Sequence, residues 1–170
     1  MANAFIGKLV PVYVALQSDK PTTTAATQYL RWGAVRDREF GPELDEVDST
    51  ADTSDGVFRQ YLSTFATHDV SLSGVTSTKA ADNLDEIESY FYDKMGAAEQ
   101  VEVWVKIFRP SSDPTNKFRS YEFPANMKTF KITGTYDDVA TWSSDLSGTG
   151  AVTVADGTAN TPQNVTIIQA

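Results

Sequence analysis

The chain of 170 residues contains no cysteine, only one histidine and no long uninterrupted apolar run. Without cysteine it can form no disulfide and carry no thiol nucleophile, although this absence does not decide the compartment. A helix needs roughly 20 apolar residues to cross a bilayer, so we expect no membrane-spanning helix. With one histidine, zinc would have to be bound almost entirely by carboxylates, which is not how zinc sites are usually built.

The negative charge of the chain is unevenly placed. The formal net charge is -9 at pH 7. Residues 37–55 include eight acidic side chains against one arginine, and residues 82–94 include five acidic side chains against one lysine. Such a balance makes the chain a poor candidate for gripping the phosphate backbone of a nucleic acid.

Residues that could carry chemistry are few. His68 has no serine or cysteine partner at the spacing of a nucleophilic dyad, which favours a structural role. The adjacent Asp137 and Asp138 are more typical of a corner than of a paired acid and base. We therefore assign no catalytic, cofactor-binding or metal-binding residue, and the protein is not predicted to be an enzyme.

An acidic run invites a calcium interpretation, but it lacks the order of acids, glycine and glutamate that defines an EF-hand. The run consists of Asp45, Glu46, Asp48, Asp52 and Asp55. An irregular calcium site stays open as an alternative.

The segment from Phe130 to Val154 predicts a strand, a corner, a strand, a turn and a last short strand. Phe130, Ile132 and Tyr136 alternate with polar residues, as on a half-buried strand. The corner is predicted at Asp137-Asp138 and a turn at residues 147–150. A further turn is predicted at Pro124-Ala125-Asn126, which leads into this segment. Further strands are predicted at 9–17, 28–35, 57–62, 68–77, 101–109, 118–123 and 165–169.

One helix is predicted, over residues 82–96. Its apolar residues recur every three or four positions and form one stripe. Asp82 is the expected N-cap, and Gly96 is expected to end the helix. The predicted packing residues of the helix and of the core it covers are Leu84, Ile87, Phe91 and Trp142.

Many strands and one helix predict a mainly β fold: a two-sheet β-sandwich or partly rolled barrel with one flanking α-helix. We expect a single domain over 1–170, with an N-terminal arm at 1–8 and a C-terminal arm at 155–170. Residues 36–56 show no periodicity and are interpreted as a long loop, and loops longer than about 12–15 residues are usually functional or disordered.

Two stretches carry short motifs in a recognisable order. The first leads from an Asp-x-Thr element at 48–50, through Asp55-Gly56, to an alternating strand that ends at Gly74. The second leads from Thr133 over an Asp-Val-Ala step at 138–140 to Trp142 and Gly150. In order and spacing, residues 28–154 resemble the major tail proteins, or tail tube proteins, of long-tailed bacteriophages.

This resemblance implies the phage tail tube fold and a structural protein of the virion. Subunits would form hexameric rings whose inner sheets join around a lumen, and the rings would stack into the tube that conducts viral DNA to the host. The loop at 36–56 would reach the neighbouring ring, and the terminal arms would order on assembly. The loop residues singled out are Arg38, Glu43, Asp45, Asp48, Asp52 and Asp55.

The implied partners are further copies of the chain and the tape-measure, tail-tip and tail-terminator proteins. Double-stranded DNA would pass without specific binding, which agrees with the absence of a basic excess. No cofactor and no membrane partner are implied, and assembly would take place in the cytoplasm of the bacterial host. Contractile and non-contractile tails both remain open.

Two other function classes remain. The first is a soluble ligand- or carbohydrate-binding β-sandwich that uses Trp32, Trp104 or Trp142 as a stacking platform, although core packing is the more usual role of a tryptophan. The second is a hydrolase that uses carboxylates. Microscopy at high protein concentration would separate them, because only the tail tube interpretation predicts rings or tubes.

Overall fold

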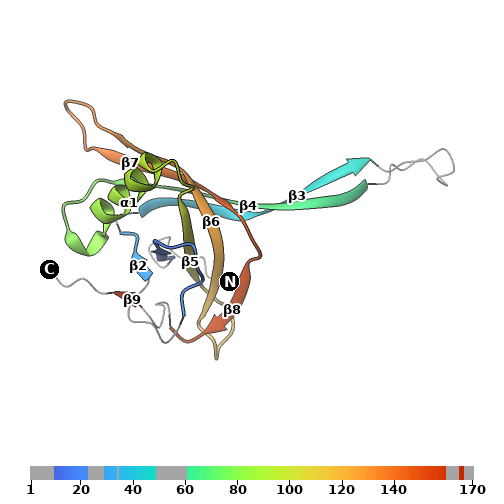
Figure 1. The fold of residues 1–170 in the computed structure, drawn as a ribbon. Coiled ribbons are helices and arrows are strands. Elements are labelled where there is room, and N and C mark those ends of the chain that lie inside the picture. The colour runs from blue at the N-terminus through green and yellow to red at the C-terminus, as the bar shows by residue number, and fades with distance from the viewer. Residues whose placement is uncertain (1–9, 23–28, 34, 49–60, 160–164, 167–170) are drawn as a thin grey trace, which may run out of the picture.

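The chain folds into a curled β-sheet with one α-helix on its flank (Figure 1). This computed structural model describes residues 10–22, 29–33, 35–48, 61–159 and 165–166. The helix α1 spans Leu84–Gly96 and follows a 3-10 turn at Ala80–Asp82. The described strands are β1 (Val12–Ala15), β2 (Tyr29–Arg31), β3 (Val35–Asp48), β4 (Tyr61–Val75), β5 (Glu102–Pro110), β6 (Phe118–Thr133), β7 (Thr141–Gly148), β8 (Thr153–Gly157) and β9 (Val165–Thr166). The predicted mainly β fold with one flanking helix is confirmed.

Strand β6 joins the two halves of the sheet, because it changes partners along its length. The sheet order is β3-β4-β7-β6-β5-β1-β2-β9, and β8 pairs with β6 outside this path. One edge of β6 pairs with β5 over residues 118–126. Its other edge pairs with β8 over 118–122 and with β7 over 125–133. The strand predicted near the C-terminus is present at Val165–Thr166, where β9 pairs in parallel with β2 at the end of the sheet.

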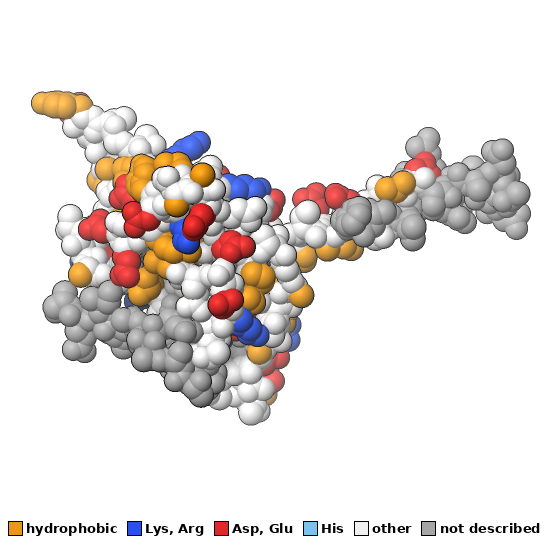
Figure 2. Space-filling model, in the orientation of Figure 1, with side chains coloured by type: hydrophobic (Ala, Val, Ile, Leu, Met, Phe, Trp, Pro, Cys, Tyr) orange, Lys and Arg blue, Asp and Glu red, His pale blue; other side chains and the backbone are white. Residues whose placement is uncertain are grey.

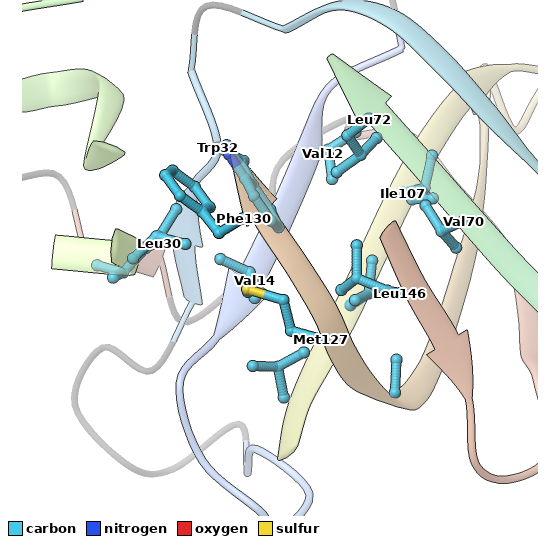
Figure 3. Close-up of a cluster of buried hydrophobic side chains, with 14 of the residues drawn as sticks. Val12, Val14, Leu30, Trp32, Val70, Leu72, Ile107, Met127, Phe130 and Leu146 are labelled. Atoms are coloured by element: carbon cyan, nitrogen blue, oxygen red, sulfur yellow. The ribbon is translucent and has the colours of Figure 1, made fainter. Parts of the chain in front are cut away.

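The two halves of the sheet fold over each other and enclose one hydrophobic core (Figure 3). Val70 of β4 lies in the same cluster as Val12 of β1 and Ile107 of β5, although β4 is a neighbour of neither strand in the sheet order. Burying one such side chain contributes roughly 1.5–3 kcal/mol. Alternation explains the pattern, because every second residue of a strand points to the enclosed face.

A stack of aromatic rings ties the helix side of the core together. The ring of Trp142 lies 5.4 Å from that of Trp32 and 6.2 Å from that of Phe130. The ring of Phe91, on α1, lies 6.5 Å from that of Phe130. Leu84 and Ile87 are buried in the same cluster, and Phe91 is partly buried against it. The four residues selected for core and helix packing therefore lie together.

The predicted N-cap of the helix is wrong by one residue. Asp82 is the last residue of the 3-10 turn, and Asn83 caps α1 with a φ of 54°. Asparagine tolerates this left-handed conformation better than most side chains. The amide of Asn83 donates to the backbone oxygens of Arg31 and Ala81, at 2.9 and 3.2 Å, and so fixes the turn to β2. The helix ends at Gly96 as predicted.

The predicted loop at 36–56 is wrong for its first part. Residues up to Asp48 form strand β3, which pairs with β4 in a long hairpin, whereas 49–60 lie outside the described residues. The strand escaped detection because β3 beyond Phe40 is largely exposed on both faces, so hydrophobic and polar residues do not alternate. Bulges between Val35 and Asp37 and between Leu44 and Glu46 disturb the period further. The strand predicted at 57–62 falls mostly outside the described residues.

The predicted turn at Pro124-Ala125-Asn126 is also wrong, because β6 continues through it. Proline is tolerated in a strand where its missing N–H is not needed by the ladder. Pro124 lies between the last residue paired with β8 and the first residue paired with β7. Its carbonyl accepts a bond of 2.9 Å from the N–H of Thr149, in the connection between those two strands. The proline thus occupies the position where β6 changes partners.

Of the predicted terminal arms, residues 1–8 lie outside the described residues. Residues 155–157 belong to β8, which pairs with β6, so the described start of the C-terminal segment is part of the sheet. Within the described ranges, no helix is long and apolar enough to cross a membrane.

Candidate assembly surfaces

One face of the sheet formed by β3, β4, β7 and the second half of β6 is covered by hydroxyl and charged side chains. We call it the polar face. It consists of Asp37, Glu39, Asp69, Ser71, Ser73, Thr129, Lys131, Ser143, Asp145 and Ser147. Cross-strand register places these residues in rows, while the alternate residues of the same strands, such as Leu72 and Trp142, face the core.

Three of the four carboxylates of the polar face, those of Asp37, Asp69 and Asp145, accept hydrogen bonds from neighbouring hydroxyls. Asp145 accepts from the hydroxyl of Ser71 at 2.8 Å and from that of Thr129 at 3.2 Å. Asp69 accepts from Ser147 at 2.6 Å. The four carboxylates on this face outnumber its lysines, Lys131 and the adjacent Lys128. The surface is therefore mildly acidic and does not attract anions.

Two strand edges beside the polar face lack a partner strand in the part of the chain that the structure describes. β3 is the last strand of the sheet order and pairs only with β4. Beyond residue 127, β6 pairs with β7 on one edge only. Unpaired edges are ready templates for pairing with another chain.

The outer part of the β3–β4 hairpin, residues 42–48 and 61–67, projects from the body and is called the arm (Figure 1). On it, Glu43, Asp45 and Asp48 are exposed, and so are the apolar Leu44 and Val47, at 59% and 54%. Figure 2 shows acidic and hydrophobic side chains along this projection.

Arg38, selected together with these acids, lies apart from them at the inner end of β3. Its guanidinium donates to the carbonyl of Val35 at 3.1 Å. Burial and the nearby Arg31 lower the pKa of Arg38. Asp52 and Asp55 lie outside the described residues, so the structure brings together three of the six selected loop residues.

A second hairpin, β6–β7, projects from the opposite end of the same four strands (Figures 1 and 2). The register shows this directly: Asp48 pairs with Tyr61 at the arm end, and Val75 pairs with Thr141 at the other. We call residues 134–140 the hairpin tip. The predicted corner at Asp137-Asp138 lies in it, and the carboxylate of Asp138 accepts from the N–H of Val139 at 2.7 Å.

The family of the chain follows from its match to a known protein family. The family model for "Phage tail tube protein" matches residues 13–154. The chain belongs to the phage tail tube protein family. It is a structural component of the virion tail, in a family that is not enzymatic. No curated protein sequence matches the chain significantly.

Solved structures share the fold of this tail tube protein. A protein of the gene transfer agent tail, refined with C6 helical symmetry, aligns with a TM-score of 0.62 and 18% identity over 89% of this chain and 99% of its own. The SPP1 tail tube aligns with a TM-score of 0.64 and 11% identity over 98% and 87%. A protein of the anti-feeding prophage baseplate gives 0.57 and 9% over 93% and 99%.

The other candidate residues of the tail tube protein mostly serve its core. Trp32 and Trp142 are buried against each other and offer no exposed platform. Trp104 is partly buried and donates to the carbonyl of Ser18 at 2.9 Å. His68 is 7% exposed and lies beside Phe123 with ring centroids 4.3 Å apart. No group of three or more metal-binding side chains occurs among the described residues.

Sequence reasoning missed two surfaces of this tail tube protein. The polar face was visible only as separate alternating strands, and nothing in the sequence showed that these strands are neighbours. Tyr136 was placed on the same strand face as Phe130, but β6 ends at Thr133 and Tyr136 lies fully exposed in the hairpin tip. The polar Gly134-Thr135 step before Tyr136 was the available signal for an earlier strand end.

Proposed function

We propose that six copies of this tail tube protein form a ring, and that rings stack into a tube whose inner wall is the polar face. The family and the fold shared with a C6-symmetric tail support the ring. The polar face is the single observation that carries the assignment of the wall. Its hydroxyl and carboxylate side chains lie in cross-strand rows over four neighbouring strands.

The two free edges explain how a ring closes. The outer edge of β3 in one copy pairs with residues 128–133 of β6 in the next, and the four-stranded sheets become one continuous barrel. Such pairing satisfies backbone groups that would otherwise stay exposed, and a head-to-tail contact that closes on itself produces a ring.

The chemistry of the polar face suits the passage of double-stranded DNA without specific binding. Phosphates bind proteins chiefly through lysine and arginine, and this face has more carboxylates than lysines. Its carboxylates are held by neighbouring hydroxyls, as at Asp145, so the wall presents a fixed polar surface. DNA is therefore neither gripped by charge nor stacked on aromatic rings.

The arm reaches the ring stacked above its own. Its exposed Leu44 and Val47 supply apolar contact area, and Glu43, Asp45 and Asp48 flank them. In the sequence, two further acids, Asp52 and Asp55, follow these residues. A two-stranded hairpin alone is at best marginally stable in water, so contact with the neighbouring ring is what fixes the arm.

The ends of such a tube need partners that are not this chain. We assign these positions to the tape-measure, tail-tip and tail-terminator proteins, with assembly in the cytoplasm of the bacterial host. This assignment rests on the family alone.

Cryo-electron microscopy of tubes assembled from the purified protein tests the proposal. We expect sixfold rings with Ser71, Ser143 and Asp145 facing the channel and β3 paired to β6 of the adjacent copy. Tubes with this face on the outside, or rings of another symmetry, would contradict it.

A further inference from the structure

The hairpin tip exposes an aromatic side chain that no described part of the chain buries. Tyr136 is fully exposed, and Val139 and Ile132 beside it are 60% and 49% exposed. Within the described residues, the Tyr136 side chain makes no hydrogen bond, ion pair or ring contact. Large aromatic side chains are the commonest anchors at the centres of protein interfaces. An anchor at the end of a projecting hairpin points to a receiving surface on another molecule.

A groove of about 270 Å³ lies at the other end of the body, where the arm begins. It lies between Pro42 of β3, Ala66 and His68 of β4, and the connection after β7, including Ala151 and Val152. Small-molecule sites usually measure about 300–1,000 Å³, so this groove has room for little more than one large side chain.

One residue that lines the groove, His68, has a buried polar atom without a hydrogen-bond partner among the described residues. The residue is buried, and the atom is Nδ1 of its imidazole. Leaving a buried polar atom unpaired is unfavourable, and one ring nitrogen of a neutral imidazole accepts a hydrogen bond. Burial lowers the pKa of His68, which favours that neutral form. A tyrosine hydroxyl is a suitable donor.

The tip and the groove lie at opposite ends of the same strands. Thr141, next to the tip, begins β7, and Gly148, in the groove, ends it. Copies stacked head-to-tail therefore bring the tip of one to the groove of the next. The groove also includes the root of the arm that we assign to the same ring contact, so the two surfaces are continuous.

We propose that Tyr136 of one copy inserts into the groove at the arm root of a copy in the adjacent ring and that its hydroxyl donates a hydrogen bond to Nδ1 of His68. This inference rests on the proposed stacking of rings. It adds a second contact between rings, distinct from the arm, and identifies its occupant as a second copy of this chain.

The absence of native cysteine makes a direct test available. Two single variants, Tyr136→Cys and Ala151→Cys, are mixed, assembled and mildly oxidised, and covalent dimers are detected by non-reducing electrophoresis. We expect dimers that contain one copy of each variant, in assembled protein only. Tyr92→Cys, at an exposed tyrosine of α1, replaces Tyr136→Cys in the matched control and should give at least about 10-fold less dimer, because the tip-to-groove contact is specific.

Each outcome is informative. Tubes without the mixed disulfide would overturn the tip contact and leave the proposed function intact, provided that the Ser71→Cys/Asp145→Cys pair, neighbours across β4 and β7, oxidises under the same conditions. Failure of the wild-type protein to form tubes would overturn both. Protection of Ala151→Cys from a thiol reagent in the monomer would show that a segment of the same chain fills the groove, which would also overturn the inference.

The contribution of the hydroxyl is separable from that of the ring. Because aromatic anchors contribute strongly to interfaces, Tyr136→Ala should raise the protein concentration needed for assembly about 30-fold. Tyr136→Phe keeps the ring and loses only the hydrogen bond, so the increase should be about 5-fold. Tyr92→Ala serves as the control, and circular dichroism of the monomers checks folding. Equal effects of Tyr136→Ala and the control would contradict the proposal.

Discussion

Along the β3–β4 hairpin, the half next to the body and the half beyond Pro42 use the same backbone ladder but bury different amounts of side chain. In the inner half, Val70 and Leu72 of β4 are almost wholly enclosed by the core. In the outer half, every described residue of β3 from Pro42 to Asp48 is exposed.

Because of this difference in burial, we expect the inner half of the hairpin to contribute to folding of the chain and the outer half to contribute to assembly. The inner half is stabilised by burial, the dominant favourable term in folding. The outer half of β3 is exposed and buries little side-chain area within a single chain, so we expect its stabilisation to depend on other copies. Changes in the two halves should therefore affect different measurements.

The largest expected effect is on the inner half. Leu72→Ala removes a buried side chain of the core, and such changes cost about 2–5 kcal/mol because of lost burial and the cavity left behind. Denaturant unfolding of the monomer measures this loss, and tubes should disappear with it. Val154→Ala, at an exposed position of β8, is the control. A cost below about 1 kcal/mol would show that this half is not held by the core.

Deletion of residues 50–55 should abolish tubes without unfolding the chain. The deleted residues follow the exposed part of β3, so the free energy of unfolding of the monomer should change by no more than about 0.5 kcal/mol, as for surface changes generally. Circular dichroism and denaturant unfolding measure the monomer, and negative-stain microscopy measures assembly. Normal tubes formed by the deletion variant would show that residues 50–55 are not needed to connect rings.

A smaller effect on assembly is expected for Ser143→Lys on the polar face, in the part of the sheet that belongs to the body. Tubes should still form, because Ser143 is exposed in the monomer. The added lysines, repeated around each ring, should retain double-stranded DNA at low salt and release it at high salt. Fluorescence anisotropy of labelled DNA added to tubes measures retention, with Ser143→Gln as the control. DNA retention by the wild-type tube, or none by the lysine variant, would contradict the assignment of this face to the channel.

The smallest effect concerns His68, where the two halves of the hairpin meet. Burial lowers its pKa below the value of about 6.5 expected in the unfolded chain. Below that pH the unfolded state binds more protons than the folded state, so stability falls as pH drops through about 6.5 and levels off below the folded pKa. Denaturant unfolding of the monomer between pH 5 and 8 should show this decline in the wild type and not in His68→Gln. Parallel curves would refute it, because His68 is the only histidine.

The sequence predicted the elements whose faces differ in environment. Val101, Val103, Val105 and Ile107 are buried at alternate positions, because β5 faces the core on one side only. The helix stripe was found for the same reason. In the arm both faces meet water, so no alternation marks the strand, and β3 was mistaken for a loop.

The remaining errors arose where a tertiary contact overrides a local preference. Pro124 normally signals a turn, but here it lies where the ladder needs no donor. The polar face could not be assembled from the sequence, since it depends on the order β3-β4-β7-β6, in which β7 lies between strands that precede it in the chain. Glu43, Asp45 and Asp48 lie exposed on the arm, and their selection for contact between rings stays a prediction, whereas Arg38 lies apart from them and was grouped with them by sequence proximity alone.

The two hairpins at opposite ends of one sheet give every subunit a direction. In a stack built from such subunits, one end always offers arms and the other always offers tips, so all subunits point the same way. Growth of such a stack then needs one protein that starts it by exposing one kind of end, and another protein that stops it by covering the other kind of end.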